Sequence, residues 1–245
     1  NGELFSPTYL KTIHNQLSAI LNHAVNMYGL KDNVARKAGT MGKEEHKEME
    51  FWTQEEFQAF LECVADKPIS YYAFEMLYWT GLREGELLAL TPADFNFEKK
   101  TLRVNKSYQR LEGKDVITDP KTPKSNRTIV MPDFLTIEME DFIKSIYGIK
   151  MDDRIFTISK SYLHHEMDRG AKLAGVKRIR IHGLRHSHIS LLINLGFSAL
   201  AIGERVGHEA VDITYHYAHL FPTVQTDMAA QLETEREALV NVRKE

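Results

Sequence analysis

Arg83 and Glu86 stand three residues apart in the segment TGLREGELLAL, residues 80–90. A glycine turn precedes the pair and leucines follow it, so both side chains share one face at the start of a predicted helix. An arginine fork beside a carboxylate is suited to holding a phosphate oxygen. On its own, however, such a pair is more often an exposed ion pair worth about 0.3 kcal/mol.

His182 and Arg185 form a second candidate site in IHGLRHSHISLL, residues 181–192. A helix N-terminus that carries an arginine and a histidine is a natural place for an oxyanion. The cluster of His182, His186 and His188 also raises the possibility of a metal site. We disfavour that interpretation, because Gly183 stands where the zinc-protease helix has a glutamate. We therefore predict no bound metal.

The third candidate segment is ERVGHEAVDITYHYAHL, residues 204–220, in which Gly207-His208 precedes Tyr215 and Tyr217. Residues two apart on a helix point about 200° away from each other, so only one of these phenols can face a given neighbour. The residues of this segment leave open whether either hydroxyl is a nucleophile or both rings are packing groups.

Taken together, in this order and at these separations, the three segments resemble the tyrosine recombinase (phage integrase) family over residues 53 to about 230. Integrases of conjugative transposons and temperate phages of Gram-positive bacteria are the most similar members. The resemblance implies that Arg83, with Glu86 supporting it, corresponds to the family's first arginine. Its other implied catalytic residues are Lys121 of KTPKSNR, His182, Arg185, His208 and, nine residues beyond that histidine, Tyr217. Lys124 is the nearby lysine that we do not expect to be catalytic.

The implied reaction is phosphoryl transfer on DNA without a cofactor. Arginines that are already in place stabilise the charge that builds up on the non-bridging oxygens. Tyr217 would attack the phosphorus, His182 would help to remove its proton, and Lys121 would protonate the leaving 5′-oxygen. The product is a 3′-phosphotyrosine link, which a new 5′-hydroxyl can reverse. A mobile genetic element would be integrated or excised in this way.

The distribution of charge also favours double-stranded DNA as the partner. The net charge is only −3, yet residues 99–131 carry nine Lys/Arg against three Asp/Glu, and residues 159–188 carry seven against two. Local basic surface binds phosphate whatever the total charge is. The side chains that we expect to contact DNA are Arg103, Lys106, Arg110, Lys124, Arg127, Lys172, Lys177, Arg178 and Arg180.

The elements that must position these residues are mainly helical, with one small antiparallel β-sheet of about three strands, an α+β class. A long amphipathic helix begins after Ser6-Pro7 and resembles the end of the family's helical core-binding domain. We expect the C-terminal part of that domain at 1–37, a linker at 38–52, a catalytic domain at 53–223 and a helical tail at 224–245. The region that would precede the first helix, including an arm-binding domain, is expected to be missing.

Partners and location follow from weaker signals. The amphipathic tail would pack either on its own domain or on a neighbouring protomer, as in a tetramer on DNA, and accessory proteins would set the direction of recombination. A single cysteine and the lack of a signal peptide or apolar span favour the cytoplasm and disfavour a membrane. Two alternatives remain open, namely a DNA-binding protein with an inactive site and a metal-dependent hydrolase.

Overall fold

The computed structural model describes residues 5–42, 49–119 and 125–207, together with residues 217, 232–234 and 236. The chain divides into two compact units, Asn1–Met49 and Glu50–Glu245. No helix among the described residues is both long enough and apolar enough to cross a bilayer.

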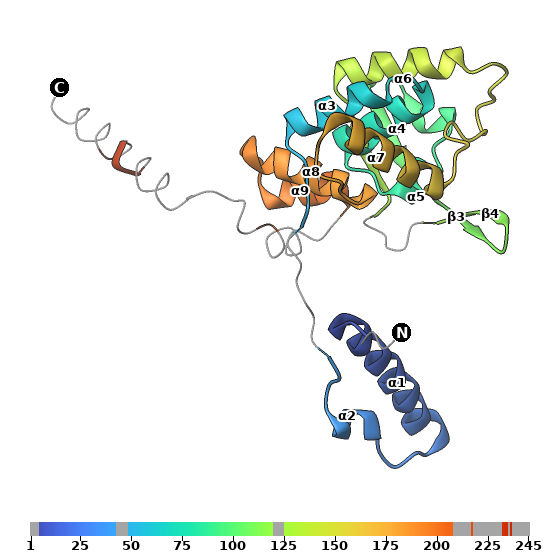
Figure 1. The fold of residues 1–245 in the computed structure, drawn as a ribbon, viewed down its shortest axis with the longest axis vertical. Coiled ribbons are helices and arrows are strands. Elements are labelled where there is room, and N and C mark those ends of the chain that lie inside the picture. The colour runs from blue at the N-terminus through green and yellow to red at the C-terminus, as the bar shows by residue number, and fades with distance from the viewer. Residues whose placement is uncertain are drawn as a thin grey trace. The chain divides into compact units, whose positions relative to one another are not determined.

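Unit 1 consists of helix α1, Pro7–Tyr28, and the short helix α2, Val34–Ala38 (Figure 1). The Ser6 hydroxyl accepts a hydrogen bond from the Tyr9 N–H at 3.2 Å, and Pro7 occupies the first turn, so α1 begins where the sequence predicted. Asn33 joins the two helices, because its side-chain amide donates to the Ser18 carbonyl and its oxygen caps α2.

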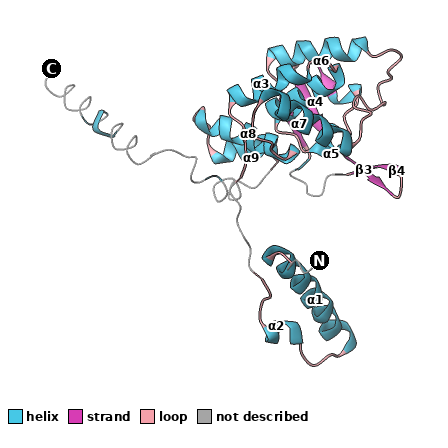
Figure 2. Ribbon diagram, viewed as in Figure 1, coloured by secondary structure: helices cyan, strands magenta, loops and turns pink. Residues whose placement is uncertain are grey.

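Unit 2 is mostly helical, with a few short strands (Figure 2). Its helices are α3 Gln54–Val64, α4 Pro68–Thr80, α5 Glu84–Leu87, α6 Asp133–Ser145, α7 Lys160–Ala174, α8 Ile181–Asn194 and α9 Ala199–Val206, with a 3₁₀ turn η1 at Pro92–Asp94. Helix α3 begins with a capping box, since the side chains of Thr53 and Glu56 each bond the other residue's backbone N–H.

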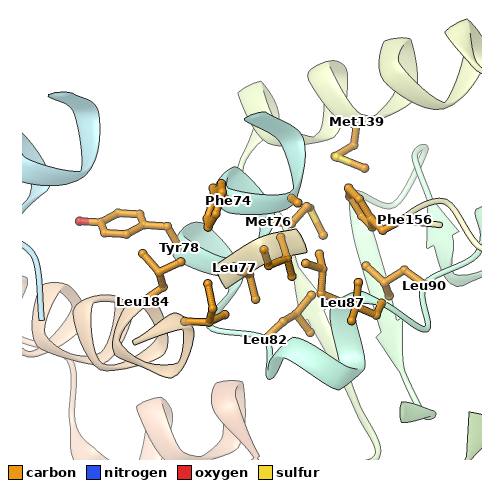
Figure 3. Close-up of a cluster of buried hydrophobic side chains, with 14 of the residues drawn as sticks. Phe74, Met76, Leu77, Tyr78, Leu82, Leu87, Leu90, Met139, Phe156 and Leu184 are labelled. Carbon is orange, nitrogen blue, oxygen red and sulfur yellow. The ribbon is translucent and has the colours of Figure 1, made fainter. Parts of the chain in front are cut away.

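Helix α4 lies at the centre of the core (Figure 3). Large side chains surround it from α5, α6 and α8, and the labelled residues in the figure are Phe74, Met76, Leu77, Tyr78, Leu82, Leu87, Leu90, Met139, Phe156 and Leu184. Trp52, which stands at the end of the predicted linker, also belongs to this core. Only 1% of its surface is exposed, and its indole N–H donates to the Lys177 carbonyl at 2.7 Å.

The strands form two antiparallel sheets where the sequence predicted one. The first has the order β1 Phe95–Asn96, β2 Thr101–Val104 and β5 Arg127–Val130, and the second is the hairpin of β3 Ser107–Leu111 and β4 Lys114–Thr118. The run KTLRVNKSYQR holds two strands, β2 and β3, separated by Asn105 and Lys106. The Lys106 ammonium group binds Asp94 at 2.6 Å and Thr91 at 3.0 Å. The mainly α class with small antiparallel sheets is confirmed.

Candidate active site

The turn between α4 and α5 places Arg83 close to α8. Gly81 has φ +65°, a left-handed conformation that favours glycine, and a Cβ there would lie 2.7 Å from the ring carbon Cδ2 of His188. The Gly81 carbonyl accepts a hydrogen bond from Arg185 Nη1 at 2.6 Å. A glycine is therefore needed both for the shape of the turn and for the close approach of α8.

Arg83 is held by Glu86. The Arg83 backbone N–H donates to Glu86 Oε2 at 2.9 Å, and its Nη1 donates to Oε1 at 2.8 Å. Its Nη2 donates to the carbonyl of Gly207 at 3.2 Å, which ties α5 to the end of α9. The pair is thus not the exposed ion pair that such spacing usually gives.

Arg127 is the second arginine on the same carboxylate. Its Nη1 and Nη2 donate to Glu86 Oε1 and Oε2 at 3.1 and 2.9 Å. Burial raises the pKa of Glu86, but the hydrogen bonds and charges of Arg127 and then Arg83 outweigh it, so the net pKa is lowered. Glu86 is therefore ionised at neutral pH, between two arginines.

Arg127, predicted to contact DNA, is buried in this structure. Only 8% of its surface is exposed. Besides Glu86, its guanidinium donates to the carbonyls of Arg205 and Ser125 at 3.0 and 3.1 Å, so four of its five N–H groups are bonded within the protein. The basic run in the sequence could not show this, because the partner carboxylate lies 41 residues earlier.

Arg185 is almost fully buried, with 1% of its surface exposed. Its Nη1 and Nη2 donate to the carbonyls of Gly81 and Val206, while its Nε has no hydrogen-bond partner among the described residues. Burial, and after it the positive charge of Arg83, lower the pKa of Arg185 to about 9. The guanidinium remains charged at pH 7, and an added anion would offset the cost of burying it.

The three histidines of α8 have different surroundings. His182 is exposed and its pKa is lowered by desolvation of part of the ring and then by Arg185 and Arg83, so it is neutral at pH 7. His188 is buried, and its Nε2 accepts a hydrogen bond from Arg205 Nε at 3.1 Å. Within the described ranges, no group of His, Cys, Asp or Glu side chains is arranged to hold a metal ion.

Tyr217 is buried, with 2% of its surface exposed, and its hydroxyl is hydrogen-bonded to Nδ1 of His186. Burial raises the pKa of this phenol above its usual range, and the charge of Arg185 offsets only part of the effect. Sequence reasoning gave the proton-accepting role to His182 and considered His186 only as a metal ligand. The rings of His182 and His186 lie edge to face, with centroids 4.8 Å apart, one turn apart on α8, and that spacing was the available signal.

An open pocket of about 480 Å³ lies beside Arg83. Its wall comes from α5, the β3–β4 hairpin and the first turns of α7 and α8. The lining residues are Arg83, Glu84, Gly85, Glu86, Val104, Lys106, Ser107, Tyr108, Gln109, Thr118, Asp119, Ser125, Lys160 and His182. Lys160 was not among the predicted DNA contacts, although it belongs to the second basic segment. Arg185 and Tyr217 are not part of the pocket wall.

The other predicted DNA contacts fall into two groups. Arg103, Arg110, Lys172 and Arg180 are exposed, and the first two come no closer than 3.9 Å to a carboxylate. Lys106, Lys177 and Arg178 have carboxylate neighbours at 2.6, 3.8 and 2.7 Å, namely Asp94, Glu56 and Asp168. Lys121, Lys124 and His208 lie outside the residues that the structure describes.

Comparison of the sequence with known proteins identifies one family. The model of the phage integrase family matches residues 50–223. This chain belongs to that family. The ICEBs1 integrase of Bacillus subtilis (strain 168) is 32% identical to it over 243 residues, which cover 91% of this chain and 65% of that protein. A tyrosine recombinase XerC-like protein of Caldanaerobacter subterraneus subsp. tengcongensis is 28% identical, with the same coverage.

Solved structures agree on the fold of this phage integrase relative. The Tn1549 transposon integrase in complex with a circular intermediate DNA superposes with a TM-score of 0.77 at 21% identity, over 93% of this chain and 80% of that one. A lambda integrase dimer bound to a COC′ core site gives 0.58 at 17% identity, over 81% and 71%. The chain spans about 65% of the length of the two curated relatives, a little under two thirds.

Proposed function

We propose that this chain is the catalytic part of a site-specific DNA recombinase that cuts and rejoins strands through a covalent 3′-phosphotyrosine. The observation that carries the proposal is the convergence of Arg83, Arg185 and Tyr217 from distant segments. Arg83 reaches Gly207, Arg185 reaches Gly81 and Val206, and the Tyr217 hydroxyl meets the helix of Arg185 through His186. Integration or excision of a mobile element is the outcome we propose.

The pocket beside Arg83 supports a phosphate as the reacting group. Arg83, Lys106 and Lys160 line it, and His182 supplies a neutral imidazole that can donate a hydrogen bond. Arg185 lies outside the pocket wall, and among the described residues its guanidinium bonds two carbonyls and no carboxylate. The transition state of phosphoryl transfer is stabilised by positive groups that are fixed in place before the reaction. The proposed chemistry therefore needs no metal.

In the proposed step, the Tyr217 oxygen forms a bond to phosphorus as the bond from phosphorus to the 5′-oxygen breaks. The phenol proton passes to a histidine, and we now favour His186 over His182, because its Nδ1 is in hydrogen-bond contact with the phenol. Lys121 gives a proton to the departing 5′-oxygen. Tyr217 lies outside the pocket wall, so for attack its oxygen must move to the phosphate as its proton passes to His186.

Double-stranded DNA is the partner we propose, since the Tn1549 and lambda integrase structures are DNA complexes and this chain has the same fold. We further propose that residues 53–223 form the catalytic domain and that the tail at 224–245 joins neighbouring protomers in a tetramer. Accessory proteins that set direction and a cytoplasmic location remain part of the same proposal.

The decisive experiment uses a nicked DNA substrate that traps the covalent intermediate, in buffer containing EDTA. We expect a covalent protein–DNA adduct with wild-type protein and with Tyr215→Phe, and none with Tyr217→Phe. A protein that binds this DNA without ever forming an adduct would support the inactive DNA-binding alternative. Cleavage that requires a divalent metal would support the hydrolase alternative instead.

A further inference from the structure

The C-terminal end of α9 is bound by three arginines from other parts of unit 2. The carbonyls of its last two residues and of its cap each accept one hydrogen bond. The pairs are Arg127 Nε with the carbonyl of Arg205 at 3.0 Å, Arg185 Nη2 with that of Val206, and Arg83 Nη2 with that of Gly207 at 3.2 Å. The last carbonyls of an α-helix lack partners within the helix and carry partial negative charge, so they are suited to hold guanidinium groups.

Two of these contacts orient the arginines of the proposed site. Arg83 is bound at Nη1 by a carboxylate of α5 and at Nη2 by the Gly207 carbonyl. Arg185 is bound at Nη1 by a carbonyl of the turn before α5 and at Nη2 by the Val206 carbonyl. A planar guanidinium that is held at both ends has a fixed direction. A shift of the last turn of α9 would therefore turn both groups at once.

Helix α9, which lies beside α8 (Figure 1), depends on other elements for its own position. It has only eight residues, and an isolated helix of that length is marginally stable in water. Its buried side chains Ile202 and Val206 pack on the core. Burial of apolar groups is non-directional, so it constrains the rotation of a helix less tightly than hydrogen bonds do.

The side chain of Arg205, in the last turn of α9, makes three directional contacts. Its Nε donates to Nε2 of His188 on α8 at 3.1 Å, its Nη1 to the carbonyl of Val130 on β5 at 3.1 Å, and its Nη2 to the carbonyl of Trp79 on α4 at 3.2 Å. Burial, and after it the charge of Arg205, lowers the pKa of His188 to about 3, so its ring is neutral at pH 7 and accepts this hydrogen bond. Arg205 therefore ties the end of α9 to three other elements.

We propose that Arg205 is a positioning residue, which fixes the last turn of α9 and thereby aligns the carbonyls that hold Arg83 and Arg185 for the transition state. The inference rests on the proposed function. Arg205 lies outside the pocket wall and its three hydrogen bonds go to the protein, so it acts through the two arginines and not on DNA.

Separate measurement of binding and cleavage tests this role. Arg205→Met keeps the aliphatic stem and removes the three contacts. We expect adduct formation on nicked DNA at saturating protein to slow at least about tenfold, because a misplacement of about 1 Å can cost about a hundredfold. DNA affinity, measured in the Tyr217→Phe background so that the DNA stays uncleaved, should remain within about twofold, since no DNA contact is removed.

A double-mutant cycle with Arg83→Met shows whether the two residues act together. If Arg205 works through Arg83, part of its effect is already lost in that variant. The factor by which Arg205→Met slows cleavage should therefore be at least about threefold smaller in the Arg83→Met background than in wild type. An undiminished factor would show that the two residues act independently and would overturn the proposal.

A second variant guards against misfolding of Arg205→Met. His188→Phe keeps a ring in place and removes only the acceptor of Arg205 Nε, so cleavage should slow by about two- to tenfold at unchanged affinity. Arg169→Met is the matched control, because Arg169 also makes several hydrogen bonds, to Asp66 and Glu166, and lies outside the pocket wall. It should lower the melting temperature and leave the cleavage rate of the folded protein unchanged.

The possible results separate the two proposals. Folded Arg205→Met and His188→Phe proteins that cleave at the wild-type rate would overturn the role of Arg205 and leave the recombinase proposal standing. Affinity that falls in parallel with the rate, or an equal slowing in Arg169→Met, would also overturn that role. Wild-type protein that forms no adduct would overturn the recombinase proposal itself.

Discussion

At the scale of single residues, one carboxylate organises the arginines. Glu86 accepts hydrogen bonds from both Arg83 and Arg127, yet only Arg83 reaches the pocket. Arg127 is the group that keeps the buried carboxylate ionised and in place, so that Arg83 is presented in a fixed orientation. Loss of Arg127 is therefore expected to lower the stability of the fold and to leave the contacts with DNA phosphates unchanged.

We therefore predict that Arg127→Met lowers the free energy of unfolding by about 3 kcal/mol, because the mutation leaves Glu86 buried without one of its two arginine partners. Adduct formation should fall as Arg83 loses its orientation. The slope of DNA affinity against salt concentration should not change, since no phosphate contact is removed.

Arg103→Met provides the contrast, because its side chain is 58% exposed. Loss of a phosphate contact there should reduce the salt slope by about 0.9 with little change in stability. Chemical denaturation and binding titrations at several salt concentrations would measure both effects. A reduced salt slope in Arg127→Met would restore Arg127 as a DNA contact.

At the scale of elements, the packing of α4 against α6 contains an unusual pair of acids. Glu75 on α4 is 4% exposed, and within the described part of the chain Glu75 and Glu138 each have a buried carboxylate oxygen without a hydrogen-bond partner. Burial, followed by the charge of Glu138, raises the pKa of Glu75 to about 7, although a hydrogen bond from Trp79 acts the other way. Tyr71, Tyr72 and Asp141 are the other titratable groups near the pair.

The sign of the effect on stability follows from this shift. Below pH of about 4.5 the carboxyl group of Glu75 is protonated in both the folded and the unfolded chain. As the pH rises toward 7, the unfolded chain loses this proton first, so the free energy of unfolding falls by up to about 1.4 kcal/mol per pH unit. We predict that Glu75→Gln removes this loss and is more stable than wild type at pH 8 by about 1–3 kcal/mol.

Denaturation curves collected from pH 4 to pH 8 would measure the difference. The two proteins should converge near pH 4. Glu140→Gln on α6 is the control, because that carboxylate is partly exposed and paired with Lys144. Parallel curves for Glu75→Gln and wild type across the whole range would show that Glu75 is ionised in the fold at neutral pH.

At the scale of the whole molecule, a chain of net charge −3 is proposed to bind a polyanion. The described structure supports this because basic groups from separate segments meet at the pocket, namely Arg83, Lys106 and Lys160. Glu84, Glu86 and Asp119 also line the pocket, and Glu86 is bonded there to Arg83. Affinity should depend on the local basic surface and fall steeply with salt.

Lys160 offers a specific test of this view. We predict that Lys160→Met weakens DNA binding similarly on all sequences and lowers the slope of log affinity against log salt by about 0.9, as expected for one lost phosphate contact. Lys144→Met on α6 should leave the slope unchanged. Fluorescence titrations between low and moderate salt would compare the two, and equal slopes in both variants would place Lys160 away from DNA.

The sequence by itself determined the family, the order of the helices and the segments that carry Arg83, Arg185 and Tyr217. These features depend on local spacing, because helical periodicity, capping residues and motif separations are properties of neighbouring residues. Helix α7, for example, begins after the capping residue Ser159 and ends before Gly175. The catalytic roles of Lys121 and His208 remain predictions.

Only the tertiary structure decided which charges are buried and which face the pocket. Arg103 and Arg127 lie in the same basic run, yet one is exposed and the other is enclosed by Glu86, which comes from a different element. The same holds for Tyr217, whose partner His186 lies 31 residues earlier. Burial and pairing depend on side chains that are distant in sequence, and no local pattern records which of them will meet.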